Sequence, residues 1–113
     1  MRRGEIWLIS LDPTVGAELQ KTRPAIIVSS DAIGVLPLRV VVPITDWKEP
    51  HELAEWMVKI IPNTTNCLIK PSAVDTFQIR SVSTARFVRK TGDVSIEEMD
   101  MIVEAIGLVI EFS

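Results

Sequence analysis

Short apolar runs, bounded by proline, glycine or polar residues, dominate the chain up to residue 82. Runs of this length that are rich in β-branched and aromatic residues are typical of β-strands. They predict strands over 5–11, 24–29, 38–44, 56–61 and 67–69, and one or two more within 73–82. The pattern continues through residues 83–90, and Gly92 is expected to break it.

Two prolines indicate where strands begin or lose a partner. Pro24 has no N–H for a central ladder, so it is expected at the first residue of its strand. Its ring drives Arg23 towards extended geometry. Arg23 is therefore predicted at the start of a buried strand. Its side chain either binds an anion or is simply exposed to solvent at the end of the strand. Pro43 predicts an edge or a bulge in its strand. Thr45 and Asp46 follow this strand and are expected at the opening of a pocket.

The last element has helical periodicity. Ser95 is expected to cap a helix, with Glu98 at the capping-box position. Its apolar positions recur at helical spacing and form a wide stripe: Ile96, Met99, Met101, Ile102, Val103, Ile106, Leu108, Val109 and Ile110. Such a stripe predicts either a deeply packed helix or a helix that contacts a second copy of the chain. Many short strands and one terminal helix predict a small, strongly bent sheet or barrel, with residues 1–113 as one domain.

Composition narrows the classes of function. No apolar run approaches the length of a membrane span, and the N-terminus lacks the apolar segment of a signal peptide. The single cysteine, Cys67, suits a reducing cytoplasm and is expected to be a small buried side chain. All 12 Lys and Arg residues precede Asp93, whereas six of the 15 acidic residues lie from Asp93 onward. Because the charges are unevenly distributed, a local phosphate-binding face is compatible with the net charge of −3.

The available chemistry is that of a metal-free site. One cysteine and one histidine cannot build a standard metal site, and no glycine-rich phosphate loop is present. We therefore expect no metal and no cofactor. Cleavage of RNA needs a base for the 2′-hydroxyl, a proton for the leaving 5′-oxygen and donors for the charge on the phosphorane. Arg23 and Thr45 can supply such donors if neighbouring strands bring them together.

Three ordered motifs resemble those of the MazF/PemK/Kid toxins. They are an N-terminal block (RGEIWL at 3–8, LDPTVGAE at 11–18 and KTRPAIIVS at 21–29), VPIT at 42–45 and QIRSV at 78–82. The resemblance implies a mainly β protein with a C-terminal helix, a small SH3-like barrel of the CcdB/MazF/PemK toxin fold, and a homodimer. It implies a cytoplasmic, metal-independent endoribonuclease that cuts single-stranded mRNA at a short sequence, leaving 2′,3′-cyclic phosphate and 5′-hydroxyl ends. It also implies a cognate antitoxin whose acidic, disordered tail folds on binding.

The resemblance assigns residues to roles. The family's catalytic pair falls on Arg23 and Thr45. Asp75 is a weaker catalytic candidate, because one branch uses an aspartate before the third motif, and a structural turn carboxylate is its alternative. That branch also uses a histidine in the first loop, where this chain has Ala17. The predicted RNA-binding residues are Glu18, Gln20, Lys21, Thr22, Gln78, Arg80 and Arg86, of which the last two have ion pairing within the fold as an alternative role.

Two other functions remain as alternatives. A gyrase-poisoning toxin shares the implied fold, but it requires an exposed aromatic residue at the extreme C-terminus, a position that Phe112 matches poorly. A non-catalytic SH3-like binding module requires an aromatic-lined groove. The chain has no tyrosine, and its three tryptophans are spread along the sequence.

Overall fold

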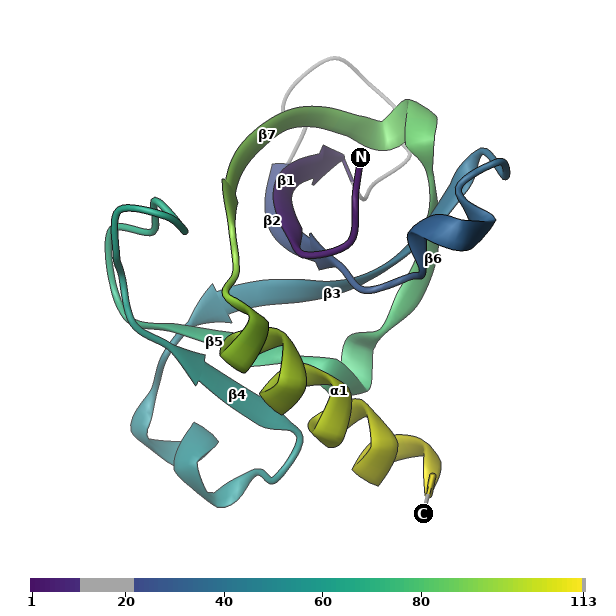
Figure 1. Ribbon diagram of the computed structural model, residues 1–113. Coiled ribbons are helices and arrows are strands. Elements are labelled where there is room, and N and C mark those ends of the chain that lie inside the picture. Colours follow the sequence, from purple (N-terminus) through teal and green to yellow (C-terminus); the bar gives the residue numbers. More distant parts are fainter. Residues whose placement is uncertain (11–21, 113) are drawn as a thin grey trace, which may run out of the picture.

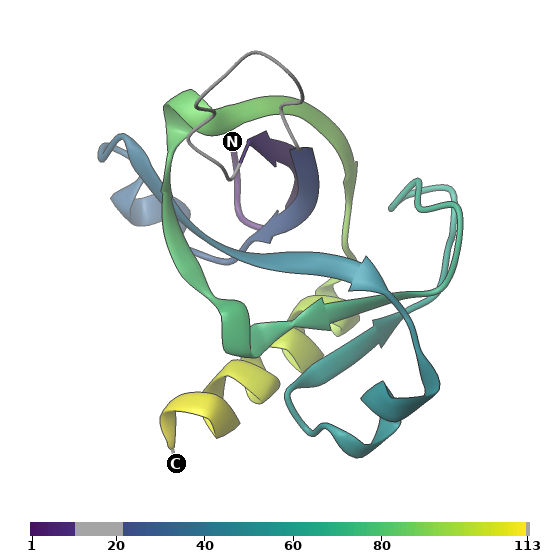
Figure 2. The same cartoon turned by 180° about the vertical axis from the view of Figure 1, so that it is seen from behind.

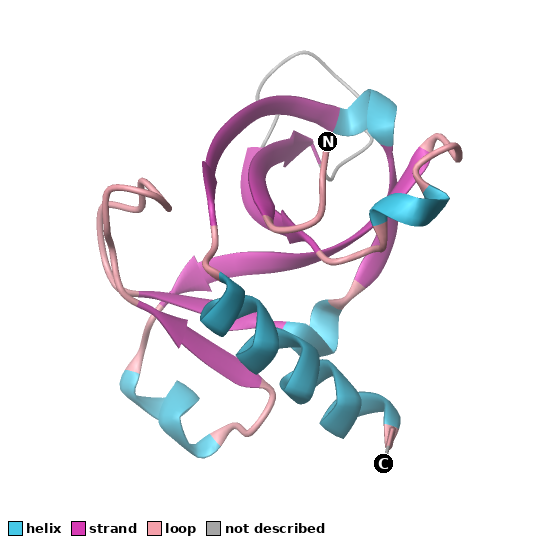
Figure 3. Cartoon of the chain, in the orientation of Figure 1, coloured by secondary structure: helices cyan, strands magenta, loops and turns pink. Residues whose placement is uncertain are grey.

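The computed structural model describes residues 1–10 and 22–112, which form a mainly antiparallel sheet followed by one helix (Figures 1 and 3). The strands are β1 (Glu5–Ser10), β2 (Thr22–Ile27), β3 (Leu38–Asp46), β4 (Met57–Ile60), β5 (Ser72–Asp75), β6 (Arg80–Ser83) and β7 (Phe87–Asp93), and the helix is α1 (Ile96–Ile110). Short 3₁₀ turns lie between them: η1 (Asp31–Ile33), η2 (Glu49–Leu53), η3 (Thr76–Gln78) and η4 (Thr84–Arg86). The predicted fold class is confirmed.

Across these two ranges, no helix has the length and apolar character needed to cross a membrane.

The sheet runs in the order β4-β5-β3-β2-β1-β7, and β6 also pairs with β3. Strand β3 borders β2 on one edge, while β5 and β6 follow one another along its other edge. The turn η3 separates β5 from β6, and Pro43 lies opposite this interruption, between the pairs Val41–Arg80 and Ile44–Val74. Strand β3 is a central strand of the sheet, but Pro43 lies where the ladder on one of its edges is interrupted. Seen from both sides, β7 arcs around β1 and β2, which gives the sheet its barrel-like curl (Figures 1 and 2).

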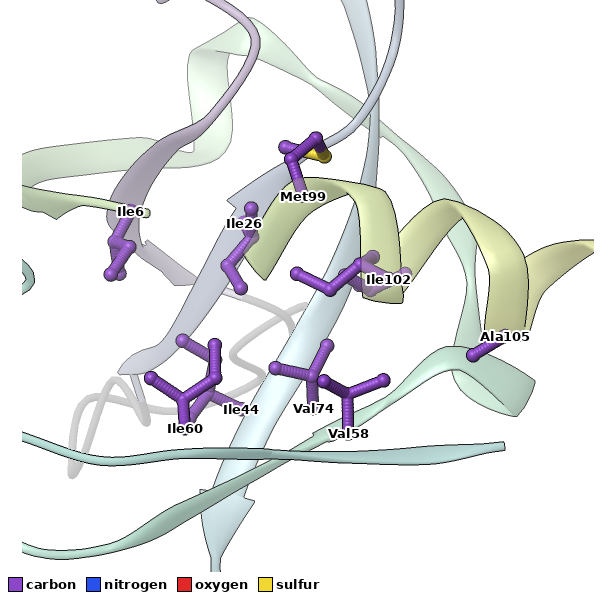
Figure 4. Close-up of a cluster of buried hydrophobic side chains, with 10 residues drawn as sticks. Ile6, Ile26, Ile44, Val58, Ile60, Val74, Met99, Ile102 and Ala105 are labelled. Carbon is purple, nitrogen blue, oxygen red and sulfur yellow. The ribbon is translucent and has the colours of Figure 1, made fainter. Parts of the chain in front are cut away.

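The central strands bury both of their faces. On one face, Ile6, Ile26 and Val42 belong to a cluster that is covered by Met99 and Ile102 of α1 (Figure 4). On the other face, a second cluster comprises Ile9, Ala25, Ile27 and Val41 of these strands and Val82 of β6. Because successive side chains of a strand point to opposite faces, a strand between two cores is apolar at every position. This explains the unbroken apolar run from Ala25 to Val28.

The helix begins as predicted but buries only part of its apolar stripe. Ser95 Oγ accepts from Glu98 N–H at 3.0 Å, and the Glu98 carboxylate accepts from Ser95 N–H at 2.8 Å. Met99, Ile102 and Ala105 are buried, whereas Ile96 and Ile110 are 78% and 62% exposed. The interpretation of α1 as a deeply packed helix is therefore wrong, and contact with a second copy stays a prediction.

Four local predictions are wrong. Residues 67–69 form a loop instead of a strand, because Cys67 has a φ of 55°, a left-handed conformation that does not fit a regular strand. Cys67 was predicted to be buried and is exposed. Gly92 lies inside β7 and does not end it. Pro24 is the third residue of β2. The strand tolerates it there because residues 22–24 pair with β1, whereas the described pairing with β3 starts at Ala25.

Candidate active site

The candidate site is a fork between β2 and β3. Their ladder pairs Ile27 with Val41, Ile26 with Val42 and Ala25 with Pro43. A pocket of about 270 Å³ lies beyond the Ala25–Pro43 end of this ladder. It is lined by the residues of β2 that precede Ala25, by the residues of β3 that follow Pro43, and by part of the chain before β5. The lining residues are Thr22, Arg23, Pro24, Ile44, Thr45, Asp46, Leu68, Ile69, Lys70 and Ser72. Arg23 and Thr45, which were predicted to meet, both line this pocket.

Arg23 and Thr45 lie just beyond the end of the β2–β3 ladder. Each is two residues from the last pair, Ala25–Pro43, so each shares the face of its strand with that pair. Each is also held by an outer strand, because Arg23 pairs with Ile9 of β1 and Thr45 with Ala73 of β5. Both side chains are exposed to the pocket. Strands held on their outer edges thus present a guanidinium and a hydroxyl to the same space.

Sequence reasoning missed a second cation at this pocket. Lys70 Nζ lies 3.0 Å from Asp46 Oδ2, and both residues line the pocket. Residues 67–69, just before Lys70, were predicted to form a strand, an interpretation that gave Lys70 no place near Thr45. The signal that was available is the run of turn residues at 62–66, which favours a loop at this point.

Asn66 holds the loop that carries Lys70. This side chain is 1% exposed, and its Oδ1 accepts from the N–H groups of Asn63 and Leu68, both at 3.0 Å. Its Nδ2 donates to the Ile61 carbonyl at 2.9 Å. The Asn66 backbone rests against Gly92, where a Cβ would overlap the Asn66 carbonyl group. Loop and strand therefore fit only because residue 92 has no side chain.

The other predicted site residues lie outside this pocket or outside the described residues. Asp75 Oδ1 accepts from Phe77 N–H at 3.1 Å and so caps η3, as the structural alternative for this carboxylate requires. Arg86 Nη1 donates to the Ser10 carbonyl at 3.2 Å. Gln78 and Arg80 are exposed on η3 and β6.

Of the remaining predicted RNA contacts, Thr22 lines the pocket. Glu18, Gln20 and Lys21 lie outside the described residues.

The most strongly perturbed carboxyl group of the described residues lies away from the pocket. Burial alone raises the pKa of Glu5, but hydrogen bonds from Arg2 N–H, the Trp7 indole and Lys90 outweigh it and lower the pKa from 4.5 to about 2. Lys90 Nζ lies 3.3 Å from Glu5 and 3.2 Å from Asp93, and these carboxylates raise the pKa of Lys90. Such networks also occur for purely structural reasons. Here the network joins β1 to β7.

The chemistry of the pocket is that of an anion site. A guanidinium presents several donors in a fixed fork that matches two oxygens of a phosphate, and a hydroxyl adds a further donor. An ammonium adds a mobile charge. The pocket therefore suits a phosphodiester whose negative charge grows during a reaction.

Comparisons with known proteins agree with this fold. Residues 2–110 match the model of the family described as "PemK-like, MazF-like toxin of type II toxin-antitoxin system". Endoribonuclease MazF9 of Mycobacterium tuberculosis is 36% identical over 96% of this chain and 94% of its own length. Endoribonuclease PemK of Escherichia coli is 61% identical over 40% of this chain and 35% of its own length.

Solved structures show the same fold at low sequence identity. A MazE–MazF crystal structure from Deinococcus radiodurans has a TM-score of 0.79 at 18% identity, covering 100% of this chain and 98% of that one. A mycobacterial endoribonuclease in complex with its cognate antitoxin has a TM-score of 0.78 at 18% identity, covering 100% of this chain and 97% of that one. With the family model and the full-length relative, these findings show that the chain belongs to the PemK-like, MazF-like toxins of type II toxin–antitoxin systems.

Proposed function

We propose that the protein is a toxin endoribonuclease that cleaves single-stranded mRNA at a short sequence without a metal ion. The products are a 2′,3′-cyclic phosphate and a 5′-hydroxyl, and the loss of mRNA arrests translation and growth. Family membership and relatives named as endoribonucleases support this proposal. Since its substrate is mRNA, the proposed site of action is the cytoplasm.

The observation that carries the proposal is the fork pocket, which Arg23 and Thr45 both line. In the proposed reaction, the 2′-oxygen attacks phosphorus and loses its proton to a base. A bond between that oxygen and phosphorus forms while the bond to the 5′-oxygen breaks, and the leaving oxygen takes up a proton. Arg23 and Thr45 donate hydrogen bonds to the non-bridging oxygens, whose charge increases in the transition state.

We further propose a homodimer and a cognate antitoxin as partners. Two structural neighbours were solved with antitoxins, the MazE–MazF complex and the mycobacterial complex, which supports a protein partner that covers the site. The cationic pocket suits the acidic tail that such a partner would provide. Copurification of the toxin with the product of a neighbouring small gene, followed by loss of RNA cleavage, checks this part.

The test is incubation of the purified protein with a long single-stranded RNA in EDTA. We expect discrete fragments with 5′-hydroxyl ends, which a kinase can phosphorylate without prior treatment. Their 3′ ends carry the cyclic phosphate and are therefore blocked to ligation and extension. Arg23→Ala is expected to abolish the fragments. Arg89→Ala is the matched control, because Arg89 is an exposed arginine of β7 that does not line the pocket.

Each outcome is interpretable. Cleavage by the wild type and by Arg89→Ala, but not by Arg23→Ala, supports the proposal. Equal cleavage by all three proteins would mean a contaminating nuclease or a different site. Intact RNA with folded wild-type protein would refute the proposed activity.

A further inference from the structure

Lys70 and Asp46 form an ion pair at the edge of the fork pocket, where an anion is expected to bind. Their side chains are 59% and 56% exposed, and Nζ lies 3.0 Å from Oδ2. A carboxylate at this place opposes the binding of a phosphate, since like charges repel. A site that binds RNA therefore needs a reason to keep Asp46 beside Arg23 and Thr45.

Stability does not supply that reason. An exposed Lys–Asp pair contributes little to stability, because water competes for both groups and both side chains lose freedom. The backbone under the pair is fixed by other bonds. Asp46 pairs with Ser72 in the β3–β5 ladder, Ser72 Oγ donates to the Lys70 carbonyl at 3.0 Å, and Trp47 N–H donates to the Pro71 carbonyl at 3.1 Å.

Those bonds leave the ammonium as the movable part of the pair. A lysine side chain is flexible and carries three donors around a compact charge, so it can exchange one oxygen partner for another by rotation. Arg23, on β2, lines the same pocket. The pocket thus combines a strand-borne guanidinium with an ammonium that already contacts a carboxylate.

We propose that Lys70 binds a backbone phosphate of the RNA next to the one that Arg23 holds, and that Asp46 competes with this phosphate for Lys70. This inference rests on the proposed function. In the free protein, Asp46 keeps the ammonium of Lys70 oriented into the pocket and neutralises its charge. A single small anion therefore binds only weakly to Lys70. A polynucleotide, which offers successive phosphates to Arg23 and Lys70 together, displaces the carboxylate.

The proposal is tested by binding, separately from cleavage. The probe is a short, randomised single-stranded RNA in which fluorine replaces every 2′-hydroxyl, so that it cannot be cut. Fluorescence anisotropy gives its affinity over a range of KCl concentrations. Phosphate contacts are independent of sequence, and each contributes about one unit to the slope of log affinity against log salt concentration.

The variants have opposite expected effects. Lys70→Met is expected to weaken binding about tenfold at low salt and to reduce the salt slope by about one unit. Lys70→Arg keeps the charge and is expected to stay within about twofold of the wild type. Asp46→Asn is expected to bind several-fold more tightly. Lys90→Met removes a lysine from another ion pair and is expected to leave the slope unchanged.

Several results would overturn the inference. An unchanged salt slope in folded Lys70→Met, with RNA cleavage by the wild type intact, would refute the role of Lys70 and leave the proposed function standing. Equal weakening by Lys70→Met and Asp46→Asn would show that the intact pair matters only for structure. If the wild type neither bound nor cleaved RNA, this inference and the proposed function would both fail.

Discussion

Two lysine–carboxylate clusters among the described residues use the same chemical groups in opposite ways. The Glu5 side chain is 13% exposed and accepts hydrogen bonds from Arg2 N–H, the Trp7 indole and Lys90, so its position is fixed. The Asp46 side chain is 56% exposed and contacts Lys70 beside an open pocket. The comparison teaches that the surroundings of an ion pair, more than its length, decide whether it holds strands together or remains available to a ligand.

The largest effect is expected from Arg23→Lys, which keeps the charge in the pocket but removes the forked donors. Because a guanidinium matches two phosphate oxygens and an ammonium does not, cleavage is expected to fall by about 10²-fold with little change in melting temperature. Initial rates on a fixed RNA measure this effect. Glu5→Gln should leave the rate unchanged, and a comparable loss of rate in that variant would break the comparison.

Next in size is Gly92→Ala, which tests the packing of β7 against the loop that carries Lys70. The added methyl group would overlap the Asn66 carbonyl group, so the free energy of unfolding is expected to fall by about 1–3 kcal/mol. Urea denaturation measures the loss. Gly107→Ala is the control, since the nearest heavy atom to its new Cβ would lie at 3.6 Å. An unaltered Gly92→Ala protein would mean that the loop moves freely on β7.

A similar or smaller effect is expected from Glu5→Gln. The low pKa of Glu5 gives stability that is fully present above its unfolded value of 4.5 and is lost as the pH falls towards about 2. The variant should be less stable at neutral pH, and its stability should vary less with pH over this acid range. Thermal unfolding at several pH values measures the difference. Parallel curves for the two proteins would show that Glu5 is not the titrating group.

The smallest effect is expected on the stability of Lys70→Met. As the pair with Asp46 is exposed, its removal should change the free energy of unfolding by less than about 1 kcal/mol. Lys90→Met, which leaves the largely buried Glu5 carboxylate without its ammonium, should lose more. Side-by-side urea curves decide the order, and a greater loss in Lys70→Met would reverse the assignment of the two clusters.

The sequence predicted those parts of the fold that depend on local pattern. Strands β1 to β4 follow from apolar runs, and the start of α1 follows from Ser95 and Glu98, whose side chains act within one turn. That Arg23 and Thr45 line one pocket was also predictable, because both lie near the ends of strands that pair. The exposure of Cys67 and the place of Lys70 were not. They depend on how the Asn66 side chain binds separate parts of one loop and on its contact with distant Gly92.

Because the fork is made of strands, the residues proposed to do the chemistry and the segments that connect the strands can change independently. Arg23 and Thr45 keep their alignment through ladders on their outer edges, whatever the connection between β3 and β4 contains. A lineage can therefore lengthen, shorten or exchange residues 48–55 without moving the guanidinium relative to the hydroxyl. Such an architecture would let new target preferences arise around an unaltered pair of proposed catalytic residues, one connecting segment at a time.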